Sequence, residues 1–211
     1  VLQCTQPVDE GLDLVRELHC HHVLQTETYK AAIEWTRRTK WNCSGNVFWM
    51  FADAYTGYTR TVIDYYNRRK PSFHPARRAF ADVLPIAWVA GETIEFAVVN
   101  DHTQEFAGVL EIVAYAFDGT VRTRVTQPIT VAANAATACT HLPKSDFEPA
   151  TETVVWMRLR VDGACIAENR FFLTGLYVKD CRIPIADVVV EQEIRDGLTT
   201  ALRVRSDRFV R

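Results

Sequence analysis

Asp53 and the aromatic residues around it are the side chains whose types and spacing could do chemistry. Asp53 follows an unbroken apolar run, Val47–Phe51, which contains Trp49, and Tyr55 and Tyr58 come directly after it. An acid that ends an apolar strand needs a hydrogen-bonding partner or a ligand. Aromatic rings stack on the apolar faces of sugars, and carboxylates accept hydrogen bonds from sugar hydroxyls. We therefore predict that these four side chains bind a carbohydrate.

Each of these residues also has a structural interpretation. Trp49 could equally pack in an apolar core, because tryptophan serves both uses. Asp53 could instead accept hydrogen bonds from the loop that follows it, as strand-end aspartates often do. Tyr55 and Tyr58 are weaker candidates for sugar contact than Asp53 and Trp49.

We interpret the other charged or potentially metal-binding side chains as ordinary surface residues. Glu34 lies four residues before Arg38, the spacing of a surface ion pair on a helix, and we do not expect it to be a nucleophile. The cluster His19, Cys20, His21 and His22 places His19 and His22 on one helix face, an incomplete ligand set, so no metal is expected.

The charge balance argues against two classes of partner. The net charge is -2, so the basic residues at 68–70 and 77–78 predict a solvated loop and helix face, not a nucleic-acid site. No apolar stretch approaches the roughly 20 residues that cross a bilayer, so no membrane partner is expected.

The six cysteines are scattered without the short paired spacing of a zinc site. We interpret them as mostly buried thiols, with one or two disulfides still open. Asn42-Cys43-Ser44 is a formal glycosylation sequon, but a three-residue match does not settle the compartment, which stays unknown between cytoplasmic, periplasmic and secreted.

Helical patterns dominate the first 82 residues. Apolar residues recur at helical spacing over 10–20 and 26–38, and a short helix is predicted from Pro75. Between them, Val47–Phe51 predicts a strand buried on both faces. A buried strand flanked by helices is typical of a parallel α/β sheet or barrel, where active sites lie at the carboxyl ends of strands.

The chain after residue 82 has the pattern of antiparallel β-structure. Alternating or β-branched runs at 91–101, 108–120, 153–164 and 168–176 end in Gly, Asn or Asp, which indicates a sandwich. Residues 185–207 predict one long hairpin that turns at Asp196-Gly197. Because an isolated hairpin is marginal in water and Val1 is not a methionine, we expect that both ends of the chain are cut.

A set of residues near the predicted buried strand also matches a family pattern. In order, they are Gly45, Trp49, Asp53, Asp64, Tyr65, Lys70, Pro71, Arg77, Arg78, Ala79 and Phe80. With them, residues 29–80 resemble the end of the catalytic barrel of glycoside hydrolase family 2, in its β-mannosidase and exo-β-glucosaminidase branch. "VVNDHTQEFAGVLEIVAYAFDG" is similar to the β-sandwich that follows that barrel, and the hairpin from Ile183 to the opening of a final sandwich.

The resemblance implies a mixed, mostly β fold class. An immunoglobulin-like β-sandwich at 83–180 would follow the last α/β unit of a (β/α)8 barrel at 1–82 and precede a truncated hairpin at 181–211. The chain departs from the family at Ala52, where relatives have Asn, and at Tyr55, where they have Trp. A lost amide hydrogen bond is worth about 1 kcal/mol, so the activity of the parent protein is an open question.

The resemblance also implies a function: a C-terminal fragment of a retaining exo-β-glycosidase, β-mannosidase-like, that acts on terminal β-linked sugars. Retaining hydrolysis needs two carboxylates about 5–5.5 Å apart, and a barrel supplies them from different strands. A single barrel strand cannot provide both, so we expect the catalytic glutamates upstream, no catalytic residue in this chain and no activity of the chain alone. No cofactor is implied; the expected partners are carbohydrate and the remainder of the parent chain.

The sequence leaves one alternative from a different class, a non-catalytic carbohydrate-binding or structural β-sandwich module.

Overall fold

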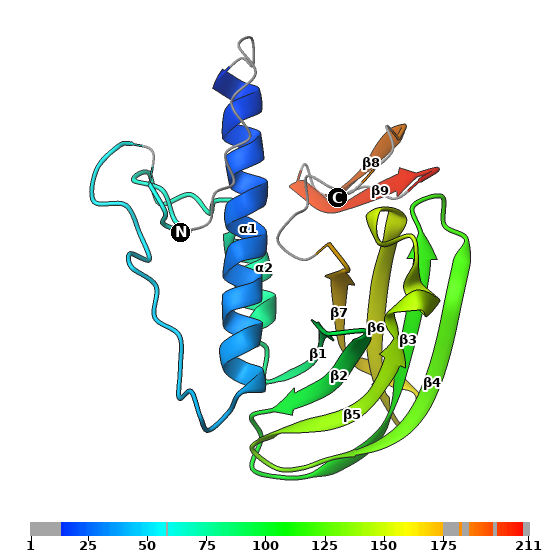
Figure 1. Ribbon diagram of the computed structural model, residues 1–211. Coiled ribbons are helices and arrows are strands. Elements are labelled where there is room, and N and C mark those ends of the chain that lie inside the picture. The colour runs from blue at the N-terminus through cyan, green and yellow to red at the C-terminus, as the bar shows by residue number, and fades with distance from the viewer. Residues whose placement is uncertain (1–13, 58, 175–181, 183–185, 196–197, 209–211) are drawn as a thin grey trace. The chain divides into compact units, whose positions relative to one another are not determined.

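The chain changes from helix to strand at the predicted position. The computed structural model describes residues 14–57, 59–174, 182, 186–195 and 198–208. Within them, the last helix ends at Ala79 and the first strand begins at Val83 (Figure 1). The prediction of a mostly β chain is therefore confirmed. Internal contacts divide the chain into two units, each described by itself below.

The first unit comprises residues 1–86, 96–107 and 130–139 and contains both helices. α1 (Leu14–Arg38) is one continuous helix where two shorter ones were predicted. α2 (Phe73–Ala79) begins two residues before the predicted proline start. Ile33 of α1 packs against Ala76 and Ala79 of α2, and Figure 1 shows the two helices side by side.

Polar contacts tie the end of α1 to the β part of the first unit. The Arg37 guanidinium donates to the Ala79 carbonyl oxygen at 2.6 Å and to an Asp101 carboxylate oxygen at 2.9 Å. The Lys40 ammonium donates to the other Asp101 carboxylate oxygen at 2.6 Å. Both cationic side chains are largely buried, so Asp101 neutralises charges that would otherwise be costly to hold out of water.

The predicted buried strand at Val47–Phe51 is wrong in this structure. The run has no regular secondary structure, and its surroundings form only isolated bridges, a parallel one between Ala52 and Ile63 and an antiparallel one between Ile63 and Arg69. Val47 is 90% exposed and Trp49 is 88% exposed. A strand buried on both faces needs partner strands on both edges, and among the described residues this run has none beyond the bridge at Ala52.

The described strands form three sheets. β1 (Val83–Ala90), β2 (Thr93–Asn100) and β5 (Ala135–Pro143) pair in the order β1-β2-β5. β3 (Phe106–Ala116), β4 (Val121–Val131), β6 (Thr153–Val161) and β7 (Ala164–Phe172) pair in the order β4-β3-β6-β7. Two short 3-10 turns, Lys144–Phe147 and Ala150–Glu152, precede β6.

The second unit comprises residues 87–95, 108–129 and 140–211, and a row of aliphatic side chains is buried on one face of the β3–β6 pair. In that antiparallel pair Leu110 lies opposite Leu159, and Ile112 lies opposite Met157. These four side chains are fully buried, and each contributes roughly 1.5–3 kcal/mol through burial. The alternation along both strands explains why the sequence predicted them correctly.

The predicted hairpin is confirmed as β8 (Val188–Arg195) paired antiparallel with β9 (Leu198–Ser206). Its predicted turn at 196–197 lies outside the described residues. The register places Val190 opposite Val204 on one face and Glu191 opposite Arg203 on the other. The hairpin is therefore amphipathic, with its apolar side chains more than half exposed at Val190 and Val204.

We predict that Gly108→Ala destabilises the protein. A Cβ atom at Gly108 of β3 would lie 2.8 Å from the Arg160 carbonyl oxygen of β6, a backbone atom that cannot move without disturbing the sheet. We expect a loss of about 1–3 kcal/mol in the free energy of unfolding, measured in urea. Gly45→Ala is the control, because a Cβ there meets nothing within 4 Å. Equal stability of the two variants would contradict the packing described for β3 and β6.

Candidate functional site

Asp53 is held where two irregular segments of the first unit meet, linked by isolated bridges. The Asp53 backbone N–H donates to the Ile63 carbonyl oxygen at 3.0 Å, and the Ile63 N–H donates to the Phe51 carbonyl oxygen at 3.1 Å. The Lys70 N–H in turn donates to the Val62 carbonyl oxygen at 2.9 Å. The backbone thus brings the Asp53 and Lys70 side chains together from positions 17 residues apart.

Four side chains close into one polar network. Asp53 Oδ1 accepts hydrogen bonds from the hydroxyls of Thr59 and Thr61, the latter at 2.6 Å. Asp53 Oδ2 lies 3.0 Å from Lys70 Nζ. The Lys70 ammonium also donates to Thr59 Oγ1 at 2.9 Å and to Thr61 Oγ1 at 2.7 Å, so all three of its protons have acceptors.

The Asp53 carboxylate is ionised in this network. Burial by itself raises the pKa of Asp53, since the side chain is only 3% exposed. Hydrogen bonds from Thr59, Thr61 and Lys70, together with the lysine charge, outweigh this effect and hold the pKa below its ordinary value. A carboxylate of this kind cannot donate a proton at neutral pH, which excludes it as a general acid.

α1 supports the network from one side. Gln25 Nε2 donates to the Thr61 carbonyl oxygen at 3.1 Å, and Ser72 Oγ donates to Gln25 Oε1 at 3.2 Å. Tyr29 donates its hydroxyl proton to the Arg60 carbonyl oxygen. Thr61 and Ser72 are fully buried, so these bonds satisfy groups that have no access to water.

The predicted aromatic residues lie near Asp53 in sequence but point largely to solvent. Trp49 is 88% exposed and Tyr55 is 61% exposed, so both rings are accessible to a ligand. The Tyr55 ring lies over Gly57, within 3.2 Å of the position that a Cβ atom would take there. Tyr58, the fourth predicted residue, lies outside the described residues.

These contacts favour the structural alternative for Asp53, since protein groups engage both of its oxygens. Carbohydrate binding by Asp53, Trp49, Tyr55 and Tyr58 stays a prediction. The sequence analysis missed Thr59, Thr61 and Gln25 as functional or supporting residues. Hydroxyls at alternate positions, Thr59 and Thr61, are the signal that could have found two of them, because alternate residues of an extended chain share one side.

Glu34 differs from its prediction. It is 6% exposed and forms an ion pair with Lys30 at 2.6 Å, so it is a buried, paired group and not a solvated surface one. The side of α1 that carries Glu34 is buried within the first unit. The helical periodicity of the sequence alone did not indicate this. The described residues contain no group of three or more His, Cys, Asp and Glu side chains placed to hold a metal, and the side chains of His19 and Cys20 are outside them.

Cys43 and Cys165 are free thiols in the described part of the chain. Partial burial raises the pKa of the Cys139 thiol to about 11, so it stays protonated at neutral pH. Cys43 and Cys139 are half-buried, so the prediction of mostly buried thiols is wrong for the cysteines whose side chains are described. Cys165 is instead exposed. None of the described helices is long and apolar enough to span a membrane.

Comparison with known proteins confirms the family resemblance at the level of a domain and a fold. Residues 92–176 match the family model described as a Mannosidase Ig/CBM-like domain, so the sheets there belong to an immunoglobulin-like domain. No curated protein sequence matches the chain.

Solved structures extend the similarity beyond that domain. The β-D-mannosidase of Dictyoglomus thermophilum aligns with a TM-score of 0.80 at 24% identity, over 94% of this chain and 24% of that one. The exo-chitosanase CsxA of Amycolatopsis orientalis aligns with a TM-score of 0.67 at 15% identity, over 87% of this chain and 25% of that one. The chain therefore spans about a quarter of these structures, and identities this low show the fold alone.

We predict that Asp53→Asn destabilises the protein by about 3 kcal/mol at neutral pH, because it leaves the Lys70 charge unpaired at a largely buried site. The folded-state pKa of Asp53 lies below its ordinary value of 3.8, so its stabilising effect is full above that value. It is lost as pH falls through the folded-state pKa, and the two proteins should then converge. Urea unfolding at several pH values measures this difference.

Asp64→Asn is the control, because its partner Arg68 is 71% exposed and a solvated ion pair contributes little. A difference between Asp53→Asn and the unmodified chain that does not change with pH would contradict an ionised, paired Asp53.

Proposed function

We propose that this chain is the C-terminal part of a larger retaining exo-β-glycosidase of the β-mannosidase type. Residues 1–82 would be the end of its catalytic (β/α)8 barrel, residues 83–180 its immunoglobulin-like domain, and residues 181–211 the opening hairpin of a further β-sandwich. The two catalytic glutamates would lie in the upstream part of the parent chain. The chain by itself would not hydrolyse glycosides.

The observation that carries the proposal is the extent of the structural match. The mannosidase domain covers residues 92–176, whereas the alignment with the D. thermophilum enzyme covers 94% of the chain. The similarity therefore includes most of the helical segment before the domain and of the hairpin after it. A free binding module would have no use for these flanking elements.

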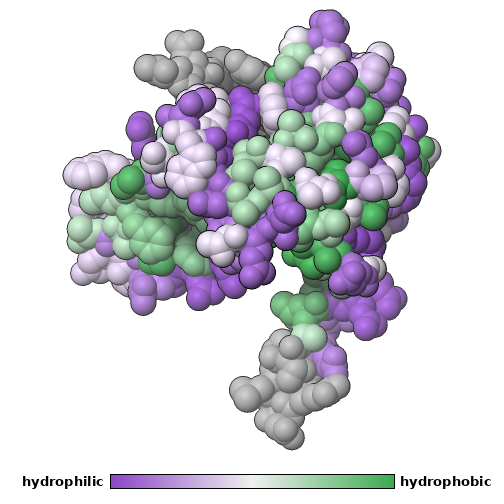
Figure 2. All heavy atoms as spheres, turned by 90° about the horizontal axis from the view of Figure 1, so that it is seen from below, coloured by the Kyte–Doolittle hydropathy of each residue, from purple (hydrophilic) through white to green (hydrophobic). Residues whose placement is uncertain are grey.

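Apolar surface in the first unit supports the same conclusion. Val47, Trp49 and Phe51 are all at least half exposed. On the face of the molecule drawn in Figure 2, apolar residues (green) reach the surface among hydrophilic ones (purple). An exposed apolar run marks a place where another surface packs. In a complete barrel, strands would pair with both edges of this run, helices would cover its outer face and the packed barrel interior its inner face, which is the burial that its composition predicts.

Trp49 is the residue of this segment best suited to contact substrate in the proposed parent enzyme. It lies four residues before Asp53, at the position that the family pattern gives to tryptophan. An indole ring beside the sugar would stack on the apolar face of the pyranose. Asp53 would act indirectly, by fixing the loop that follows Trp49 through its network with Lys70 and the two threonines.

We predict that Trp49→Ala lowers the kcat/KM of the parent enzyme for 4-nitrophenyl β-D-mannoside by roughly tenfold or more, through the loss of this stacking surface. Trp41→Ala is the matched control, since Trp41 is also exposed but follows α1 directly, and it should leave kcat/KM unchanged. The glucosamine-configured substrate would be assayed in parallel, because relatives with the two activities share this fold.

If Trp49→Ala and Trp41→Ala lower the kcat/KM of the parent enzyme equally, the result would contradict a specific role of Trp49. A parent protein with no activity on either substrate, or hydrolysis by the chain by itself, would overturn the proposed function.

A further inference from the structure

We propose that the immunoglobulin-like domain carries its own carbohydrate-binding site, which takes a single sugar ring on Tyr115 and Trp156. The site lies on the face of the four-stranded sheet opposite to the buried Leu110 and Ile112, a surface called the aromatic face below. It goes beyond the proposed function and rests on that function only for the choice of sugars in the test.

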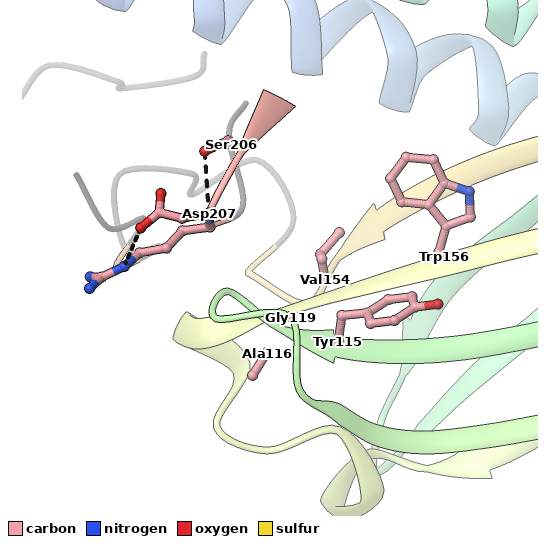
Figure 3. Close-up of a pocket in the computed structure, with 8 residues that line it drawn as sticks. Tyr115, Ala116, Gly119, Val154, Trp156, Ser206 and Asp207 are labelled. Atoms are coloured by element: carbon pink, nitrogen blue, oxygen red, sulfur yellow. Dashed lines mark hydrogen bonds and ion pairs between the residues drawn. The ribbon is translucent and has the colours of Figure 1, made fainter. Parts of the chain in front are cut away.

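The register of β3 and β6 places the two aromatic side chains together. Tyr115 lies opposite Val154, and Trp156 lies opposite Val113, so the two aromatics are diagonal neighbours on one face of the sheet. Both are half-buried and thus reach solvent. Figure 3 shows their rings on the same side of the strands.

Both rings are held in place before any ligand binds. Tyr115 packs against a buried cluster of Phe117, Val154 and Phe172. The Trp156 indole N–H donates to Glu168 Oε2 at 3.3 Å, and the Arg158 guanidinium carbon lies 5.7 Å from the indole centroid. Rings fixed on strands lose little conformational entropy when a ligand stacks on them.

A hollow of about 260 Å³ lies beside these rings within the second unit. Its floor is apolar and includes Tyr115, Val154 and Trp156 (Figure 3). Its opposite edge is polar and is formed by Ser206, Asp207 and Arg208. The hydroxyl, carboxylate and guanidinium groups of this edge can accept and donate hydrogen bonds.

The chemistry of the hollow favours a sugar over other ligands. A pyranose has an apolar face that stacks on aromatic rings and a rim of hydroxyls that bonds to polar groups, and the hollow offers both surfaces. Pockets for drug-sized ligands measure roughly 300–1,000 Å³, so a smaller hollow suits one ring and not an extended peptide or lipid chain. Glu168 and Arg158 add an acceptor and donors beside Trp156.

The test follows the indole N–H signals of the tryptophans by ¹⁵N NMR while methyl β-D-mannopyranoside or methyl β-D-glucosaminide is added to the 211-residue chain. Trp156→Phe assigns the signal of Trp156. We expect that signal to shift and saturate, with an affinity in the ~1 mM range or weaker. In the Trp156 variants, where that signal is absent, binding is followed through the backbone amide signals of β3 and β6. Trp156→Ala should weaken binding roughly tenfold or more, while Ile166→Ala, an exposed apolar control on the same sheet, should not change it.

The outcomes separate this site from the proposed function. A shift confined to the Trp49 signal would overturn the aromatic face as a binding site and leave the proposed function standing. No shift of any indole signal in either sugar would overturn the site as well. If Trp156→Ala fails to fold, saturation of the Trp156 signal in the unmodified chain and retained binding by Trp156→Phe still decide the question.

Discussion

The apolar run Val47–Phe51 imposes the constraint on which the first unit depends. Its side chains are apolar on both faces, and burying each large one would contribute roughly 1.5–3 kcal/mol. In this chain Phe48 alone is turned inward, where its ring centroid lies 5.0 Å from that of Tyr29 and 6.0 Å from that of Phe80. The other side chains of the run reach solvent. The composition of this run requires burial on both faces, but the chain buries only one of them. This mismatch is the physical basis for placing the segment inside a larger protein.

Around that run, hydrogen bonds and ion pairs fix the positions of segments that strand pairing would otherwise fix. Asp53 and Lys70 join two loop segments, Gln25 connects them to α1, and Asp101 connects the end of α1 to the strand β2. Hydrogen bonds and ion pairs of this kind are directional, so they fix geometry even where little apolar area is buried. The immunoglobulin-like domain differs, since its strand pairs bury complete rows of aliphatic side chains and specify their register through them.

The sequence predicted the features that depend on local side-chain patterns and missed those that depend on contacts between distant residues. β3, β6 and the terminal hairpin were predictable because alternation of side chains is a local pattern. β4 was missed because Val121–Val131 alternates exposed polar residues with small or half-buried ones and contains Pro128, and β1 was missed because Pro85 interrupts it. Asp53 was singled out correctly as a residue in need of a partner. Of its partners, Thr59 and Thr61 leave only the local signal of alternate hydroxyls, and the pairing with Lys70 comes from a loop fold that no local pattern encodes.

The measurement that tests the central claim most directly is amide hydrogen exchange at residues 47–51, in this chain alone and in the longer parent protein. The account predicts rapid exchange in the chain alone, because within the described structure these residues belong to no sheet. It predicts strong protection in the parent, where strands on both sides would bond to their backbone. Equally rapid exchange in both proteins would show that this run is not a barrel strand, and would contradict the account.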